Sequence, residues 1–265
     1  MKDLEYDVAD HIATLTLNRP EKKNAFTEDM LSEMCERLQQ AQADDNVRVI
    51  VLTGAGDAFC SGGDVSRRAN ELEKGPPTVL QNKQRLMTKG PQRVALALTN
   101  VDKPVLAALN GVAVGAGMDL ALMCDLRVAT RSARLCEGYI RVGLVPGNGA
   151  CYFLPRMVGV GKALELLWTA DFISSEEALR LGLVEQVYDD DSFREQTAAL
   201  ARKIASAPPV QVRAIKRTLY QSLGTDLRTS LELVSSHMAI VNTTDDYREA
   251  IAAFKEKRQA HFQGK

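Results

Sequence analysis

The sequence predicts an α/β core followed by a C-terminal helical subdomain. Through residue 206, short segments of β-branched and other apolar residues alternate with segments whose apolar residues recur at helical spacing. Beyond Ala207-Pro208-Pro209 the pattern is helical to the end of the chain. We therefore expect a core over residues 1–206 and a helical subdomain over residues 207–265. A chain of 265 residues is long enough to bury a large core.

Three segments open the predicted core. His11–Asn18 alternates apolar and polar residues, which is typical of a strand. Phe26–Ala43 places its apolar side chains on one helical face, and Thr27 stands where it would cap that helix. Val47–Thr53 is rich in β-branched residues, which favours a buried strand.

The alternation of strands and helices continues through the rest of the core. Ser66–Gly90 is charged and contains a Gly-Pro-Pro turn, so we expect a mobile segment there. The other predicted elements are a helix at 93–98, a strand at 104–110, a helix at 118–124, a strand at 126–129 and a last strand at 183–187.

Charge and cysteine content exclude several classes of protein. A formal net charge of −1 gives no basis for attraction to nucleic acid or to a membrane. No apolar run reaches the roughly 18 residues that span a bilayer, and the acidic first ten residues do not resemble a signal peptide. The five cysteines lack a CxxC pair, which indicates a reducing, cytoplasmic compartment, and no metal-ligand spacing is present.

Three loops that follow predicted strands combine glycine with single functional groups. They are FCSGGD at 59–64, NGVAVGAGMD at 110–119 and GLVPGNG at 143–149. One such loop is explained by a turn that requires positive φ. Three together also suit a site in which two backbone N–H groups approach one ligand oxygen, because small residues allow that approach. A thioester carbonyl that becomes an enolate is an oxygen of this kind.

Several motifs resemble, in order and spacing, those of the crotonase (enoyl-CoA hydratase/isomerase) superfamily. The resemblance covers nearly the whole chain and rests on Asn18-Arg19-Pro20 with Asn24-Ala25, Phe59–Asp64, Pro104–Gly111 with Gly115–Leu120, Cys124-Asp125, Gly143–Gly147, Arg156–Gly159, Gly182–Val184 and Thr244–Phe262.

The resemblance implies a fold, an assembly and a substrate. The crotonase fold is a spiral of ββα units with a C-terminal helical trimerisation region, and its members are trimers or dimers of trimers. The substrate is an acyl-CoA thioester, so coenzyme A enters as part of the substrate and no separate cofactor is implied. The two oxyanion N–H groups of the family fall on Gly63 and Ala116.

The same resemblance implies contacts with coenzyme A. The pantetheine arm would lie along the first loop and the nucleotide near the 18–25 motif, with a basic residue from the last helix near the phosphates. The implied substrate-binding positions are Lys22, Lys23, Ala25, Ser61, Gly62, Asp64, Val65, Gly115, Gly147, Asn148 and Lys257. For the three lysines, a solvated surface charge explains the residue equally well.

The acid pair departs from the pattern of the family's hydratases, which use two glutamates. Asp119 stands at the first of these positions, and Tyr139 stands at the second. Aspartate withdraws the carboxylate by about 1.5 Å, which matters because a general base acts only within hydrogen-bond range. Asp119 would also suit the first turn of a helix as a dipole-stabilised acid. The phenol of Tyr139 could donate a hydrogen bond or act as an acid, or its ring could form an aromatic wall of the acyl pocket.

Two further groups could compensate for the missing glutamate. Glu137 lies two residues before Tyr139 and shares its face if the stretch is extended, although an exposed surface glutamate is the simpler interpretation. Asn148 could orient water or a carbonyl, or could serve only as a turn residue.

Three functions remain open at this stage. The first, which we favour, is a hydratase or isomerase of an enoyl-CoA that uses Asp119 with Tyr139 or Glu137. The second is another crotonase reaction, such as hydrolysis of a thioester or cleavage of a ring C–C bond. The third is a catalytically weak CoA-ester binder or trimeric scaffold.

Overall fold

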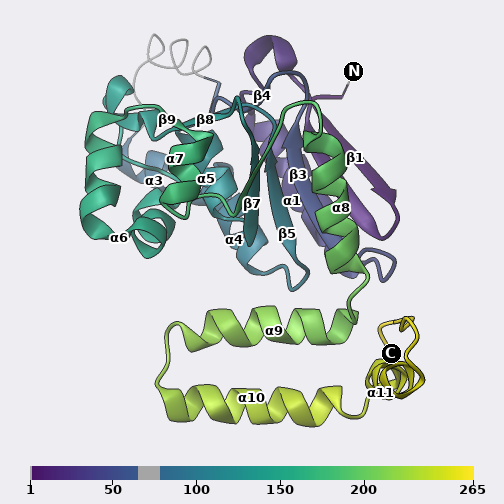
Figure 1. Cartoon of the computed structure of the whole chain (residues 1–265). Helices are drawn as coiled ribbons and strands as arrows, with labels where there is room; N and C mark the ends of the chain where they lie inside the picture. Colours follow the sequence, from purple (N-terminus) through teal and green to yellow (C-terminus); the bar gives the residue numbers. More distant parts are fainter. Residues whose placement is uncertain (1, 65–77) are drawn as a thin grey trace.

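The computed structural model describes residues 2–64 and 78–265 and shows a mixed α/β core above a layer of C-terminal helices (Figure 1). A six-stranded sheet runs in the order β1-β2-β3-β5-β7-β10. Its strands are β1 (Leu4–Ala9), β2 (Ile12–Leu17), β3 (Val49–Gly54), β5 (Val105–Leu109), β7 (Leu126–Thr130) and β10 (Gln186–Tyr188). Only the β1–β2 pair is antiparallel, so β2 to β10 align their carboxyl ends at one edge.

A second, four-stranded sheet takes the strands that alternate with these. Its order is β4-β6-β8-β9, with β4 (Ala58–Cys60), β6 (Val112–Val114), β8 (Arg134–Cys136) and β9 (Ile173–Ser174). Each of β3, β5 and β7 is followed by a short strand of the second sheet and then by helical structure. This repeat of ββα units confirms the predicted architecture.

The helices of the core surround the two sheets. They are α1 (Glu28–Ala43), α3 (Val79–Thr88), α4 (Gln92–Thr99), α5 (Ala116–Leu122), α6 (Ala150–Thr169), α7 (Ser175–Arg180) and α8 (Phe193–Ala205), with short 3-10 helices η1 (Pro20–Lys22) and η2 (Gly138–Val142). Thr27 caps α1 as predicted, because its side chain accepts a hydrogen bond from the N–H of Met30.

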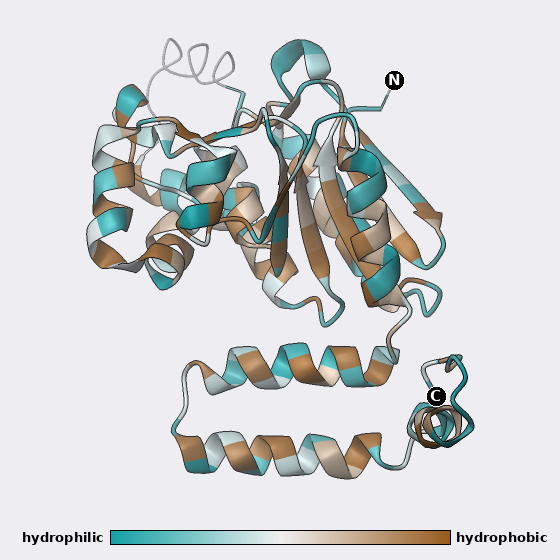
Figure 2. Cartoon of the chain, in the orientation of Figure 1, coloured by the Kyte–Doolittle hydropathy of each residue, from teal (hydrophilic) through white to brown (hydrophobic). Residues whose placement is uncertain are grey.

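The hydrophobic core lies on both faces of the six-stranded sheet. On one face, α1, α4 and α5 bury the larger cluster, which includes Leu15, Phe59 and Met118. On the other face, α8 packs Phe193 and Ala201 against the sheet. Figure 2 shows the hydrophobic residues gathered along β3, β5 and β7. The central parallel strands are buried on both faces, which explains their nearly unbroken apolar sequences.

The C-terminal helices α9 (Pro209–Ser222), α10 (Leu227–Val241) and α11 (Asp245–Glu256) follow α8, and the predicted division at residue 206 falls in the turn before α9. A polar clamp joins α9 to the core. Lys216 on α9 forms a 2.6 Å ion pair with Asp125, and the Tyr220 hydroxyl donates to the same carboxylate at 2.9 Å. These contacts hold α9, the first helix of the C-terminal layer, against the core.

The structure corrects the sequence analysis in three places. The segment 78–90, predicted to be mobile, contains α3 and the turn into α4, while 65–77 lie outside the described residues. Strand β1 is not predicted by the sequence, because only Leu4 of its six residues is buried and the alternation is too weak to detect. The strands β4, β6 and β8 likewise give no signal of their own, since three residues are too few to show a period.

Within the described ranges, no helix is both long and apolar enough to cross a membrane. The same residues contain no group of three or more His, Cys, Asp or Glu side chains placed to hold a metal ion.

Candidate active site

Two loops meet at the carboxyl ends of β4 and β6, and their backbones are nearly in contact. A Cβ on Gly117 would lie 2.1 Å from the carbonyl oxygen of Cys60. A Cβ on Gly62, whose φ is +97°, would lie 3.0 Å from the carbonyl oxygen of Val114. No side chain fits at either glycine, which explains why both loops are built from small residues.

This approach brings two unpaired N–H groups into one place. Phe26 forms a parallel bridge beside Gly63: its N–H donates to Gly62 at 2.9 Å, and its carbonyl accepts from Asp64 at 3.1 Å. The N–H of Gly63 therefore points away from Phe26. Ala116 begins α5, so its N–H has no acceptor within the helix. Among the described residues, neither N–H donates a hydrogen bond.

Asp119 lies one turn into α5 and is completely buried. The Tyr139 hydroxyl donates a hydrogen bond to its Oδ2, whereas no described residue donates to Oδ1 at full hydrogen-bonding geometry. Burial raises the pKa of Asp119 to about 7, although the Tyr139 hydroxyl and the backbones of Asn148 and Ala150 oppose that rise. The first turn of α6 thus faces a carboxyl group that titrates near neutral pH.

Glu137 is also buried, with 1% of its surface exposed, so the surface interpretation of this residue is wrong. Neither of its carboxyl oxygens has a hydrogen-bond partner among the described residues. Burial, and then the charge of Asp119, raise the pKa of Glu137 well above its usual range. Asp119 and Glu137 are therefore two electrostatically linked acids in a dry environment.

Tyr139 on η2 connects these acids to the third loop. Burial, and then Asp119, raise its pKa, so the phenol stays protonated and acts as a donor. The carbonyl of Tyr139 accepts from Leu144 at 3.1 Å, and Gln92 on α4 donates to the carbonyl of Gly147 at 2.9 Å. Asn148 follows in the same loop and is buried. The hydrogen bond to Asp119 supports the donor interpretation of Tyr139.

The candidate coenzyme A positions at the first motif lie beside the first loop. The Ser61 hydroxyl donates to the carbonyl of Lys22 at 3.2 Å, which ties the loop to η1. Lys23 is half exposed and forms a 2.6 Å ion pair with Asp57. Ala25 is buried, its N–H donates to the carbonyl of Lys22 at 3.0 Å, and its carbonyl accepts from Arg19.

The structure gives less support to three other candidate positions for coenzyme A binding. Asp64 forms a 3.1 Å ion pair with Arg19, which gives it a structural role in holding the loop. Lys257 caps α11, on the other side of the molecule from α5 (Figure 1). The chain by itself therefore does not bring Lys257 to the first loop. Val65 lies outside the described residues.

Two residues that hold the site are absent from the candidates that the sequence suggests. Asn24, fully buried at φ 56°, donates to the carbonyls of Ala55 and Ala58 and accepts from the N–H of Arg19. Arg19 in turn donates to the carbonyl of Ala25 at 2.7 Å and pairs with Asp64. Their place in the first motif is the signal that could have found them.

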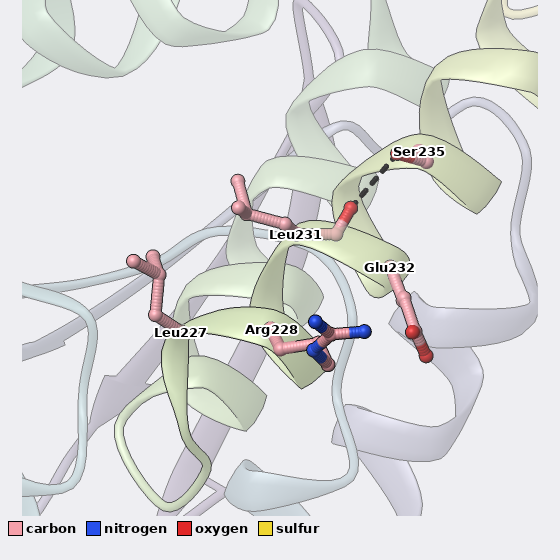
Figure 3. A pocket seen from close by; sticks show the side chains of 5 residues that line it. All are labelled: Leu227, Arg228, Leu231, Glu232 and Ser235. Carbon is pink, nitrogen blue, oxygen red and sulfur yellow. Dashed lines mark hydrogen bonds between the residues drawn. The ribbon is translucent and has the colours of Figure 1, made fainter.

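A surface hollow lies far from these groups, on α10, lined by Leu227, Arg228, Leu231, Glu232 and Ser235 (Figure 3). Leu227 and Leu231 lie on one side of the helix and Glu232 on the other (Figure 3). The hollow belongs to the C-terminal helical layer, not to the cluster around Asp119.

Comparison with known proteins identifies the family. A model of the enoyl-CoA hydratase/isomerase family matches residues 7–265. The chain is 35% identical over 254 residues to 1,2-epoxyphenylacetyl-CoA isomerase of Escherichia coli, covering 96% of this chain and 95% of that protein. It is also 35% identical over 251 residues to a short-chain-enoyl-CoA hydratase of Clostridium acetobutylicum, covering 94% and 92%.

Solved structures agree with this assignment. An enoyl-CoA hydratase from Bacillus anthracis superimposes with a TM-score of 0.92 at 34% identity, covering 100% of both chains. The chain belongs to the enoyl-CoA hydratase/isomerase family of the crotonase superfamily, which confirms the resemblance seen in the sequence.

Replacing Asp119 should change the pH dependence of stability. Between the unfolded pKa near 4 and the folded pKa of about 7, the folded chain binds more protons, so its free energy of unfolding falls as pH rises. We expect Asp119→Asn to remove about 2–3 kcal/mol of that fall between about pH 5 and pH 8, measured by urea unfolding.

Asp246→Asn provides a matched control, because Asp246 is also buried but accepts hydrogen bonds from the N–H groups of Gln263 and Gly264 at 2.7 and 2.8 Å. Asp246→Asn should lower the free energy of unfolding at both ends of that range, near about pH 5 and near about pH 8. If the free energy of unfolding depended on pH in the same way in the wild type and in Asp119→Asn, the pKa of Asp119 would not be raised in the folded chain.

Proposed function

We propose that the protein is an enzyme of the enoyl-CoA hydratase/isomerase type that acts on an acyl-CoA thioester through an enolate. One observation carries the proposal: the unpaired N–H groups of Gly63 and Ala116 lie in adjoining loops, one turn of α5 from the buried carboxyl of Asp119. Membership of the family and the names of the relatives support the same chemistry.

In this geometry, the two backbone N–H groups and the carboxyl of Asp119 would act on different parts of the substrate. The two N–H groups would donate to the thioester carbonyl oxygen, where negative charge grows as the enolate forms, and each donor contributes roughly 10²–10³ in rate. The start of α5 adds its partial positive charge at the same point. Asp119, titrating near neutrality, would take a proton from a substrate carbon or from water. Tyr139 would fix the orientation of that carboxyl by its hydrogen bond to Oδ2.

The coenzyme A part of the substrate would lie along the first loop. The backbone carbonyls of Ser61, Gly62 and Ala25 would accept hydrogen bonds from the pantetheine arm, because a carbonyl oxygen has two lone pairs. Lys22 and Lys23 would offer charge for the phosphates. Gly115, Gly147 and Asn148 would border the acyl end. No separate cofactor is part of the proposal, since coenzyme A arrives with the substrate.

We also propose that the chain acts in the cytoplasm as a homotrimer or a dimer of trimers. The five cysteines are all free thiols, as suits a reducing compartment. Hydrophobic residues alternate with hydrophilic ones along α9 and α10 (Figure 2). The exposed members of this set include Ile215, Leu219, Leu223, Leu227, Leu231, Met238 and Ile240. An exposed apolar surface of this kind favours association with other copies.

A panel of acyl-CoA esters tests the proposed reaction. In labelled water, the wild-type protein should add water to a 2-enoyl ester or move the double bond of a 3-enoyl ester, followed by mass spectrometry. Asp119→Asn should lower kcat by about 10²–10⁴, because the general acid–base group is removed. Release of free coenzyme A would indicate a hydrolase instead. Tight binding of esters with no turnover would indicate a binding protein.

Sedimentation velocity tests the proposed assembly. The wild type should sediment at three or six times the mass of one chain. Leu219→Glu, which buries a charge in the apolar surface of α9, should shift the protein towards smaller species. Gln221→Glu adds a charge to an exposed residue of the same helix and should leave the assembly unchanged. A monomeric wild type at micromolar concentration would contradict the proposal.

A further inference from the structure

The carboxyl group of Glu137 is buried and has no hydrogen-bond partner in the part of the chain that the structure describes. It is 1% exposed, and both oxygens lack a hydrogen-bond donor among the described residues. A buried charge normally has a partner or a ligand, because desolvation costs several kcal/mol. By contrast, buried Arg127 donates to the carbonyls of Leu183 and Cys124 at 2.7 and 2.8 Å and pairs with Glu185. Packing alone does not explain an acid at position 137.

The position of Glu137 follows from the second sheet. β8 ends at Cys136, whose carbonyl accepts from the N–H of Gly115 at 2.7 Å. On the other side of Glu137, a Cβ on Gly138 would lie 3.0 Å from a methyl group of Val114. Glu137 is therefore flanked by two contacts with the turn that presents the Ala116 N–H. This places the backbone of Glu137 beside the turn that presents the Ala116 N–H, and the charge interaction with Asp119 shows that its carboxyl lies near the carboxyl of Asp119.

The surrounding groups decide which acid carries the proton. On η2, the Tyr139 hydroxyl donates to Asp119, and this hydrogen bond favours the ionised form of Asp119. Arg141 on η2 donates to the carbonyl of Ala170 at 2.6 Å, and Arg134 on β8 lies 4.6 Å from the ring of Phe172.

No cation in the described part of the chain contacts the Glu137 carboxyl. Two desolvated neighbouring carboxyls do not both ionise, and Glu137, which lacks any donor, is the one that keeps its proton.

We propose that Glu137 is a catalytic residue, a neutral carboxylic acid that delivers its proton to the carbon of the enolate while ionised Asp119 acts as the base. The inference rests on the proposed function and deepens it. It assigns the role of second acid to Glu137, with Tyr139 as a positioning residue for Asp119.

In hydration, the two acids exchange one proton each with the reactants. The water oxygen bonds to C3 of the 2-enoyl thioester while Asp119 takes a proton from that water. The electrons of the C2=C3 bond move to the carbonyl oxygen, held by Gly63 and Ala116. As the carbonyl re-forms, C2 bonds to the proton of Glu137. Transfer of a proton from Asp119 to Glu137 restores the starting state. In isomerisation, Asp119 takes the proton from C2 of a 3-enoyl thioester and Glu137 protonates C4.

Glu137→Gln tests the assignment, because glutamine matches the shape of the protonated acid but has no proton to transfer. We would measure kcat and KM on the ester that the wild type turns over best, with deuterium incorporation into the product. Infrared spectroscopy at neutral pH would record the C=O band of a protonated carboxyl and its shift in deuterated water. Glu165→Gln, at an exposed position on α6, is the matched control. Thermal unfolding of each variant reports its folding.

Support would be a fall in kcat of about 10²–10⁴ in Glu137→Gln with KM changed less than about threefold, and a wild-type carboxylic acid band that this variant lacks. A Glu137→Gln enzyme with kcat within about threefold of an active wild type would overturn this inference alone. Absence of the band in the wild type would also overturn it, whatever the variant's folding. A wild type that turns over no ester would overturn the proposed function, and the role of Glu137 with it.

Discussion

The close contact between the first loop and the start of α5 is the constraint on which the site depends. A Cβ on Gly117 would lie only 2.1 Å from the carbonyl oxygen of Cys60, so glycine alone permits this approach. The contact sets the start of α5, and therefore the direction of the Ala116 N–H and the depth at which Asp119 is buried. The parallel sheets serve this arrangement, because they align the ends of β4 and β6 side by side.

Burial of acid is the second constraint. Asp119 gains one hydrogen bond, from Tyr139, whereas Glu137 gains none from the described residues. Burial raises the pKa of both carboxyls, and the charge of Asp119 adds to the rise at Glu137, so the folded chain holds protons that the unfolded chain would release. The site thus keeps groups that can transfer protons in a buried position, which lowers the stability of the fold. Functional sites commonly show this combination. A bound substrate whose polar groups contact these two carboxyls would offset part of the stability that their burial removes.

The α/β core and the C-terminal helices were predicted from apolar periodicity, which is a local signal. The family and the candidate positions Gly63, Ala116 and Asp119 came instead from motifs that resemble those of the crotonase superfamily. The sequence did not predict β1, whose single buried residue leaves no pattern, or the burial of Glu137. Burial of that residue depends on α5 and η2 packing together, which no local pattern encodes. The roles of Arg19 and Asn24 likewise appear only when the first motif meets the loop that it holds. Lys257 lies away from the site within one chain, which sequence order could not reveal.

The most direct test of the account is the polarisation of a bound thioester carbonyl. An acyl-CoA labelled with carbon-13 at the carbonyl would be bound to Asp119→Asn, which should not turn it over, and observed by NMR. Two backbone N–H groups at one oxygen predict a downfield shift on binding. The shift should persist when Ala116→Ser is added, since serine keeps the N–H, and should shrink with Ala116→Pro, which removes it. An unshifted carbonyl in a saturated complex would contradict the central claim that Gly63 and Ala116 hold the reacting oxygen.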